Sequence, residues 1–168
     1  VANRLGTEIP HLCYANKPGY RADGNCRACM VEIEGERVLA ASCIRKPSEG
    51  MKVYTNDERS KKSRQMVLEL LVTDQPKKSN AHDPESHFWK MAEKVKISKS
   101  RFDKKEQKTI PTSDNSNKAM SVNLDACIHC NLCVRACREV QVNDVIGMGM
   151  RGPTSKVIFD FDDPMGDS

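Results

Sequence analysis

The residues of this chain whose type and spacing could do chemistry are its cysteines. There are eight of them, in two groups, Cys13 to Cys43 and Cys127 to Cys137, with none between residues 43 and 127. Eight cysteines could form disulfides in a secreted protein or bind metal as thiolates in a reducing compartment. Because disulfide scaffolds usually spread their cysteines through the whole fold, the separation into two groups favours two local metal sites.

The first group has the spacing Cys13-x12-Cys26-x2-Cys29-x13-Cys43. A pair two residues apart can place both sulfurs on one metal centre, and two more cysteines complete the four thiolates of a 2Fe–2S cluster. Small residues at Gly19, Gly24 and Ala28 would let backbone N–H groups approach the cluster sulfurs. Structural zinc usually takes two closely spaced pairs, and a disulfide between Cys26 and Cys29 is the other alternative. The spacing favours the 2Fe–2S cluster.

The second group, Cys127-x2-Cys130-x2-Cys133-x3-Cys137, has the spacing of bacterial 4Fe–4S ferredoxins, with Arg138 in place of the usual Pro. We expect Cys127, Cys130 and Cys133 to bind one 4Fe–4S cluster. In two-cluster ferredoxins the fourth cysteine binds the other cluster, and the sequence contains no second cysteine run. Cys137 therefore binds a neighbouring cluster, with the sequence truncated before the second run, or binds the same cluster if there is only one.

Short strands and one helix are expected to hold the first group. Residues 30–41 alternate apolar and polar side chains around Gly35 and predict a hairpin, and residues 51–54 predict a further strand. Asn56 or Asp57 can cap a helix that ends near Val72. The apolar stripe of this helix is expected at Met66, Val67, Leu70 and Leu71.

The rest of the chain predicts a polar connection and a second small module. Asp83 and Pro84 predict the start of a helix with Phe88, Met91, Ala92 and Val95 on one side. Residues 99–119 show no periodicity, and a helix is expected to begin near Leu132. Residues 145–150 and 156–161 predict two strands. The expected organisation is α+β: a 2Fe–2S domain at 1–72, a linker at 73–119 and a 4Fe–4S module at 120–168.

The overall composition excludes several classes of function. Aromatic residues are only 5% of the 168 and charged residues 30%, and no apolar run is long enough to span a membrane. The net charge of +4 counts the cysteines as neutral, so thiolates would lower it, and it does not predict nucleic-acid binding. There is no phosphate-binding glycine loop and no Ser/His/Asp set. No catalytic residue is therefore expected.

Both groups resemble a known family of iron–sulfur proteins. Residues 9–14 (IPHLCY), 24–32 (GNCRACMVE) and 41–43 (ASC) resemble the 2Fe–2S domain shared by formate dehydrogenase alpha subunits, the related iron–sulfur subunit of complex I and hydrogenase diaphorase subunits. Residues 122–147 look most like formate dehydrogenase alpha subunits. The resemblance implies a ubiquitin-like β-grasp fold whose first hairpin lies upstream of Val1. It also implies a cytoplasmic electron relay between a molybdenum or tungsten bis-pterin centre outside this segment and flavin- and NAD-binding diaphorase subunits.

One departure from the family is informative. Family members nearest complex I carry a His-x3-Cys-x2-Cys-x5-Cys site between the two modules, whereas this chain has His82 and His87 there but no cysteine. That third cluster cannot be built, which favours formate dehydrogenase over a complex I or hydrogenase diaphorase subunit. His129, between two expected ligands, is expected at the surface. A stand-alone ferredoxin-like carrier and a zinc-binding interaction module are the remaining alternatives.

Overall fold

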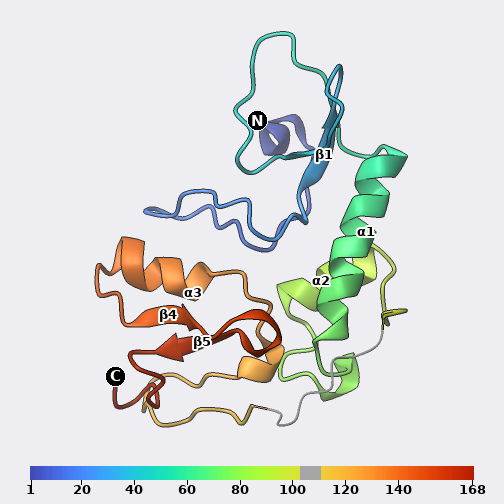
Figure 1. The fold of residues 1–168 in the computed structure, drawn as a ribbon. Coiled ribbons are helices and arrows are strands. Elements are labelled where there is room, and N and C mark those ends of the chain that lie inside the picture. Colours follow the sequence, from blue (N-terminus) through green and yellow to red (C-terminus); the bar gives the residue numbers. More distant parts are fainter. Residues whose placement is uncertain (103–110) are drawn as a thin grey trace.

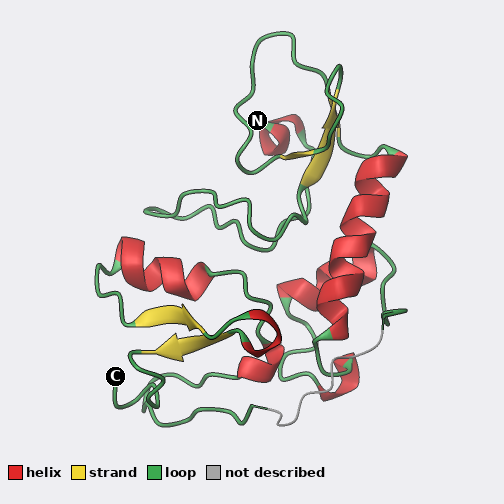
Figure 2. Ribbon diagram, viewed as in Figure 1, coloured by secondary structure: helices red, strands yellow, loops and turns green. Residues whose placement is uncertain are grey.

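The computed structural model of the chain describes residues 1–102 and 111–168. Its strands are β1 (Met30–Ile33), β2 (Ala40–Ala41), β3 (Val53–Tyr54), β4 (Ile146–Gly149) and β5 (Lys156–Phe159). Its α-helices are α1 (Glu58–Thr73), α2 (His87–Lys94) and α3 (Leu132–Arg135), with a π-helical turn over Ala136–Val140 directly after α3. Short 3-10 turns cover Ala2–Leu5, Lys78–Asn80, Leu124–Ala126 and Gly152–Thr154. The chain is therefore a small α+β protein, as expected (Figure 2).

The first cysteine group lies beside a three-stranded antiparallel sheet in the order β2-β1-β3. Met30 pairs with Ala41 and Glu32 with Tyr54. Along β1, Val31 and Ile33 are buried, because successive side chains of a strand point to opposite faces. Gly35 adopts a φ of +81° in the turn, a conformation that glycine takes without strain. The predicted hairpin and third strand are confirmed.

Helix α1 packs against β1 and begins where the sequence predicted. The side chain of Asp57 accepts a hydrogen bond of 2.9 Å from the backbone N–H of Ser60, which satisfies one of the free donors at the helix N-terminus. The predicted apolar stripe is confirmed at Val67 and Leu71, which pack against the main hydrophobic core, and is wrong at Leu70. The buried residues of α1 are Ser60, Arg64, Leu68, Glu69 and Val72, whereas Leu70 is 50% exposed. Arg64 and Glu69 are buried because each finds a hydrogen-bond partner in the interior. The buried face of α1 therefore differs from the face with the most apolar residues.

The middle of the chain contributes α2 to the main hydrophobic core. Ser86, not Asp83, caps this helix, since its hydroxyl accepts from the N–H of Trp89, and Asp83 instead accepts from Glu85 in the preceding turn. The core lies between α1 and α2 and consists of Leu12, Ala28, Leu68, Val72, Phe88, Trp89, Met91 and Ala92. Phe88, Met91 and Ala92 are buried as predicted.

The C-terminal part forms a second, smaller unit. Strands β4 and β5 pair antiparallel, with Ile146 opposite Phe159, and confirm the predicted strands at 145–150 and 156–161. Val157, Phe159 and Met165 form its buried cluster. Figure 1 shows α3 above this ribbon and the loop that follows Leu12 above α3. The division at residues 72 and 119 stays a prediction. Within the described residues, none of the helices is long and apolar enough to cross a bilayer.

Candidate metal centres

The four thiols of the first group lie together as two close pairs. Cys13 and Cys26 hydrogen-bond reciprocally: the N–H of Cys13 donates to the Sγ of Cys26 over 3.4 Å, and the N–H of Cys26 donates to the Sγ of Cys13 over 3.3 Å. The N–H of Ala28 also points at the Sγ of Cys26, 3.5 Å away. Cys13 is buried and Cys26 half-buried. These backbone donors face sulfur, as N–H groups do around iron–sulfur clusters.

Cys29 and Cys43 form the second pair. Burial raises the pKa of the Cys43 thiol to about 12, and the hydrogen bond with the Cys29 thiol and the charges of Cys29 and Cys13 add to this rise. Burial likewise raises the pKa of Cys13. Gathered thiols of this kind resist ionisation until a metal cation is bound, because a coordinating thiol is deprotonated outright. The burial and closeness of these thiols therefore favour their neutral form in the protein alone.

Small residues shape the first site. Gly24 has a φ of +65°, and a Cβ there would lie 2.9 Å from Cδ1 of Ile44. Its backbone N–H also lowers the pKa of Cys43, against the larger effect of burial. Ala28 is fully buried under the cysteine loop. Gly19 has a different role from the one expected, since it faces Val140 of the second unit, 3.1 Å from the position of a Cβ.

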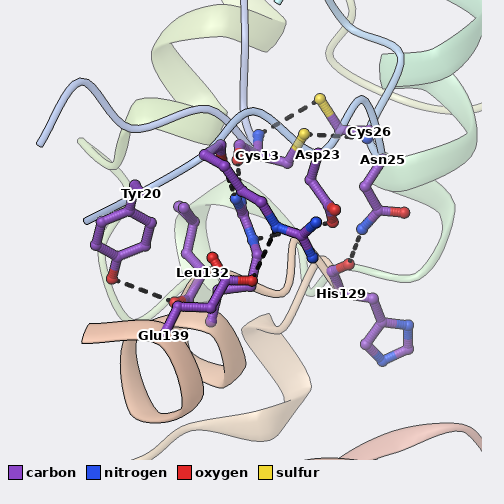
Figure 3. A network of polar contacts seen from close by, with 10 residues as sticks. Cys13, Tyr20, Asp23, Asn25, Cys26, His129, Leu132 and Glu139 are labelled. Carbon is purple, nitrogen blue, oxygen red and sulfur yellow. Dashed lines mark hydrogen bonds and ion pairs between the residues drawn. The ribbon is translucent and has the colours of Figure 1, made fainter. Parts of the chain in front are cut away.

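Two residues in the left-handed conformation separate the first three cysteines of the second group. His129 and Asn131 both have positive φ, of 51° and 61°, and such left-handed residues reverse the chain direction between successive cysteines. The N–H of His129 donates to the Sγ of Cys127 over 3.4 Å. The side chain of His129 is exposed and points away from the other labelled residues in Figure 3.

Electrostatic contacts connect the four thiols of the second group. Burial raises the pKa of Cys127, and the charges of Cys133 and Cys130 raise it further. Cys133 is exposed as a residue, and partial desolvation of its sulfur raises its pKa, with the charges of Cys130 and Cys137 contributing. Cys133 lies on α3, and Cys137 is buried in the π-helical turn. Such turns recur at functional sites.

The donor sets fit polynuclear iron–sulfur clusters. Each group supplies four sulfurs, and in the first they lie as the two pairs that two irons would take. Across residues 1–102 and 111–168, no three His, Cys, Asp or Glu side chains converge in the way a single metal ion would require. His82 and His87 are exposed, and the ring Nε2 of His87 lies 2.7 Å from the carbonyl oxygen of His11.

The two cysteine groups lie against one another (Figure 3). The hydroxyl of Tyr20 donates to the carbonyl of Leu132 over 3.3 Å, and the side-chain amide of Asn25 donates to the carbonyl of His129 over 3.0 Å. Arg21 and Glu139 form an exposed ion pair at 3.0 Å. The loop between Cys13 and Cys26 therefore forms one side of a direct contact with the second group.

Both cysteine groups pack against the hydrophobic core between α1 and α2. Cys26 and Ile128 both pack against this core. The side-chain amide of Gln75, buried just after α1, donates to the carbonyl of Cys127 over 3.4 Å. One small apolar cluster therefore carries both cysteine loops.

Sequence reasoning missed two buried arginines at these sites. Arg64 on α1 donates twice to the carbonyl of Met30, over 3.0 and 2.7 Å. Arg135 on α3 donates to the carbonyls of Arg21, over 2.6 Å, and Cys13. No sequence motif predicts that an arginine will bind backbone carbonyls in the interior. The available signal was an arginine placed midway between two expected ligands, Cys133 and Cys137.

Comparisons with known proteins identify the class of the first site. Residues 1–58 match the family of 2Fe-2S iron-sulfur cluster binding domains. The structure resembles a chain from the crystal structure of NAD+-reducing [NiFe]-hydrogenase in the H2-reduced state, with a TM-score of 0.81 and 27% identity, over 99% of this chain and 70% of that one. The N-terminal third is thus similar to 2Fe–2S cluster-binding domains.

Curated relatives extend the likeness to most of the chain. The NADP-reducing hydrogenase subunit HndD of Solidesulfovibrio fructosivorans is 34% identical over 94% of this chain and 27% of its own length. The mitochondrial NADH-ubiquinone oxidoreductase 78 kDa subunit of Candida albicans is 31% identical over 90% of this chain and 21% of its own length. The chain spans about a quarter of these relatives. The resemblance to hydrogenase and complex I subunits is confirmed, whereas a formate dehydrogenase in particular is not shown.

Proposed function

We propose that this chain carries single electrons between two iron–sulfur centres within an NAD(P)-linked oxidoreductase. Cys13, Cys26, Cys29 and Cys43 would hold a 2Fe–2S cluster, and Cys127, Cys130, Cys133 and Cys137 would supply thiolates for 4Fe–4S chemistry. The observation that carries the proposal is the direct contact between two separate all-cysteine groups on one support. Each bound cluster would accept and release one electron at a time.

The chain's own residues have three tasks in this function. Thiolates bind the iron, and backbone N–H groups, such as those of Ala28 and His129, donate to sulfur and stabilise its negative charge. The core of α1 and α2 keeps water from the back of both loops. The contacts of Tyr20 and Asn25 hold the two groups at a constant separation.

The named relatives favour a hydrogenase or an NADH dehydrogenase of the complex I kind as the enzyme. A formate dehydrogenase alpha subunit is the second candidate, and the sequence between residues 43 and 127 favours it because it lacks cysteine for a third cluster. In that case a molybdenum or tungsten pterin domain would supply the electrons. Flavin- and NAD-binding subunits are the expected partners in both cases.

Cluster content tests the electron-transfer proposal. The natural polypeptide, purified without oxygen, should contain iron and acid-labile sulfide and give two EPR signals after reduction. Cys29→Ser should remove the 2Fe–2S signal alone, and Cys130→Ser the 4Fe–4S signal alone. Zinc without iron, or a Cys26–Cys29 disulfide in protected material, would contradict the proposal.

Substrate assays distinguish the two candidate enzymes. The natural complex, reduced in turn with hydrogen, formate and NADH, should show bleaching of cluster absorbance with its own donor. Bleaching by formate would establish the second candidate, and bleaching by hydrogen or NADH alone would establish the first.

A further inference from the structure

Two buried cations flank the first cysteine group. Among the residues that the structure describes, Arg64 and Arg135 are the only buried arginine or lysine side chains, 5% and 4% exposed. Burying a charge costs several kcal/mol unless it is paired, on the order of the penalty measured for ions in protein interiors. The structure must therefore supply each guanidinium with compensating negative charge.

Arg135 lacks a close anion in the described structure. It donates to two backbone carbonyls, those of Cys13 and Arg21, and the nearest carboxylate, on Asp23, lies 3.9 Å from its Nε. That buried Nε has no hydrogen-bond partner. The ring centroid of Tyr20 lies 5.8 Å from the guanidinium carbon. Two carbonyl dipoles, this ring and one carboxylate at the outer limit of ion-pair distance are the compensation that the described residues supply.

Arg64 also donates to a backbone carbonyl next to a cysteine of the first group. Both its hydrogen bonds go to the carbonyl of Met30, the residue after Cys29. Burial lowers the pKa of its guanidinium, against the charges of Asp57 and Cys29. Unlike Arg135, it lies on α1 and forms no hydrogen bond to the second group in the described residues. The two arginines therefore differ in which cysteines they approach.

We propose that Arg135 is a positioning residue that supplies one positive charge to both centres, an inference that rests on the proposed electron-transfer function. Its guanidinium binds the carbonyl of Cys13 in the first group, and its backbone lies at the end of α3, between Cys133 and Cys137 of the second group. Four thiolates per group provide the negative charge that the buried guanidinium lacks. Arg64 does the same for the first group alone.

The sign of the effect follows from electrostatics. Reduction adds an electron and makes a centre more negative, so a buried cation nearby stabilises the reduced form and raises its potential. Arg135→Gln should lower the midpoint potentials of both centres. Arg64→Gln, the matched control, should lower only that of the 2Fe–2S centre. Arg135→Lys keeps the charge and should leave both potentials close to those of the natural protein.

Redox titration of the complete natural polypeptide, followed by EPR, tests the inference. If Arg135→Gln leaves either centre unshifted, or if Arg135→Lys shifts the potentials as far as Arg135→Gln, the inference is wrong. If Arg135→Gln fails to retain clusters, Asp23→Asn replaces it. Loss of that partly exposed carboxylate should raise both potentials, and an unshifted second centre would overturn the inference. Natural protein without iron and sulfide would instead refute the proposed function.

Discussion

Replacing Gly24 with alanine tests the geometry of the first cysteine group directly. Gly24 has a φ of +65°, where an added Cβ would lie 2.9 Å from Cδ1 of Ile44. The left-handed backbone costs an L-residue about 1–2 kcal/mol. Moving the Ile44 side chain out of its preferred rotamer costs about 0.5–1.5 kcal/mol more. We expect Gly24→Ala to destabilise the protein by about 1.5–3.5 kcal/mol from the sum of these effects.

Gly50→Ala is the matched control, because Gly50 has a φ of +73° with nothing within 4 Å of an added Cβ. It should cost only the backbone term. The assay is the urea midpoint of cluster absorbance under anaerobic conditions. With a urea dependence of about 2 kcal/mol per M, Gly24→Ala should unfold at roughly 0.5 M less urea than Gly50→Ala.

The contact with Ile44 can be isolated further by removing the atom in question. Ile44→Val deletes Cδ1, and the next atom, Cγ2, lies at an ordinary 3.4 Å. In that background Gly24→Ala should cost no more than Gly50→Ala, as a double-mutant cycle would show. Equal midpoints for Gly24→Ala and Gly50→Ala in the natural background would refute the reasoning.

Three further predictions concern the support of the sites. Asp57→Ala should cost about 1 kcal/mol by removing the α1 cap, seen as a lower unfolding midpoint, and Asp57→Asn should restore most of it. Leu68→Ala, at a fully buried position between α1 and α2, should cost about 2–5 kcal/mol and release iron from both groups at lower temperature; loss from one group only would contradict a shared support. In metal-free protein the pKa of Cys43 is about 12, against an ordinary 9.0, because the folded state favours the neutral thiol. The contribution of Cys43 to the free energy of unfolding is therefore fully present below pH 9 and is lost as the pH rises towards 12. A urea midpoint that stays constant across that range would contradict it.

Local signals in the sequence predicted most of the secondary structure. Asp57 caps α1 because its carboxylate reaches a backbone N–H three residues further along the chain. The hairpin was predictable because the alternation of apolar and polar residues and the turn at Gly35 are both local features of the sequence. The start of α2 was misplaced because Asp83 and Ser86 are both able to accept from nearby N–H groups. Sequence alone does not decide which of two such residues begins the helix.

Long-range contacts were beyond prediction from single residues. The stripe of α1 was wrong at Leu70 because Arg64 reaches a carbonyl on β1, which brings the face of Arg64 into the interior. Spacing predicted two cysteine groups, but not that the loop around Tyr20 and Asn25 would lie on the second group. Those contacts join residues more than a hundred positions apart, so no local pattern encodes them.

The shared core behind Cys26 and Ile128 has a consequence for how the chain acquires its iron. When a cluster binds to one cysteine loop, it also orders the part of α1 and α2 against which the other loop packs. Less conformational entropy is then lost when the second loop binds its cluster. Maturation should accordingly be cooperative. In the natural sequence, chains loaded at one group only should therefore be fewer than independent loading of the two groups would give, and loss of either centre to oxygen should speed the loss of its neighbour without being required for it.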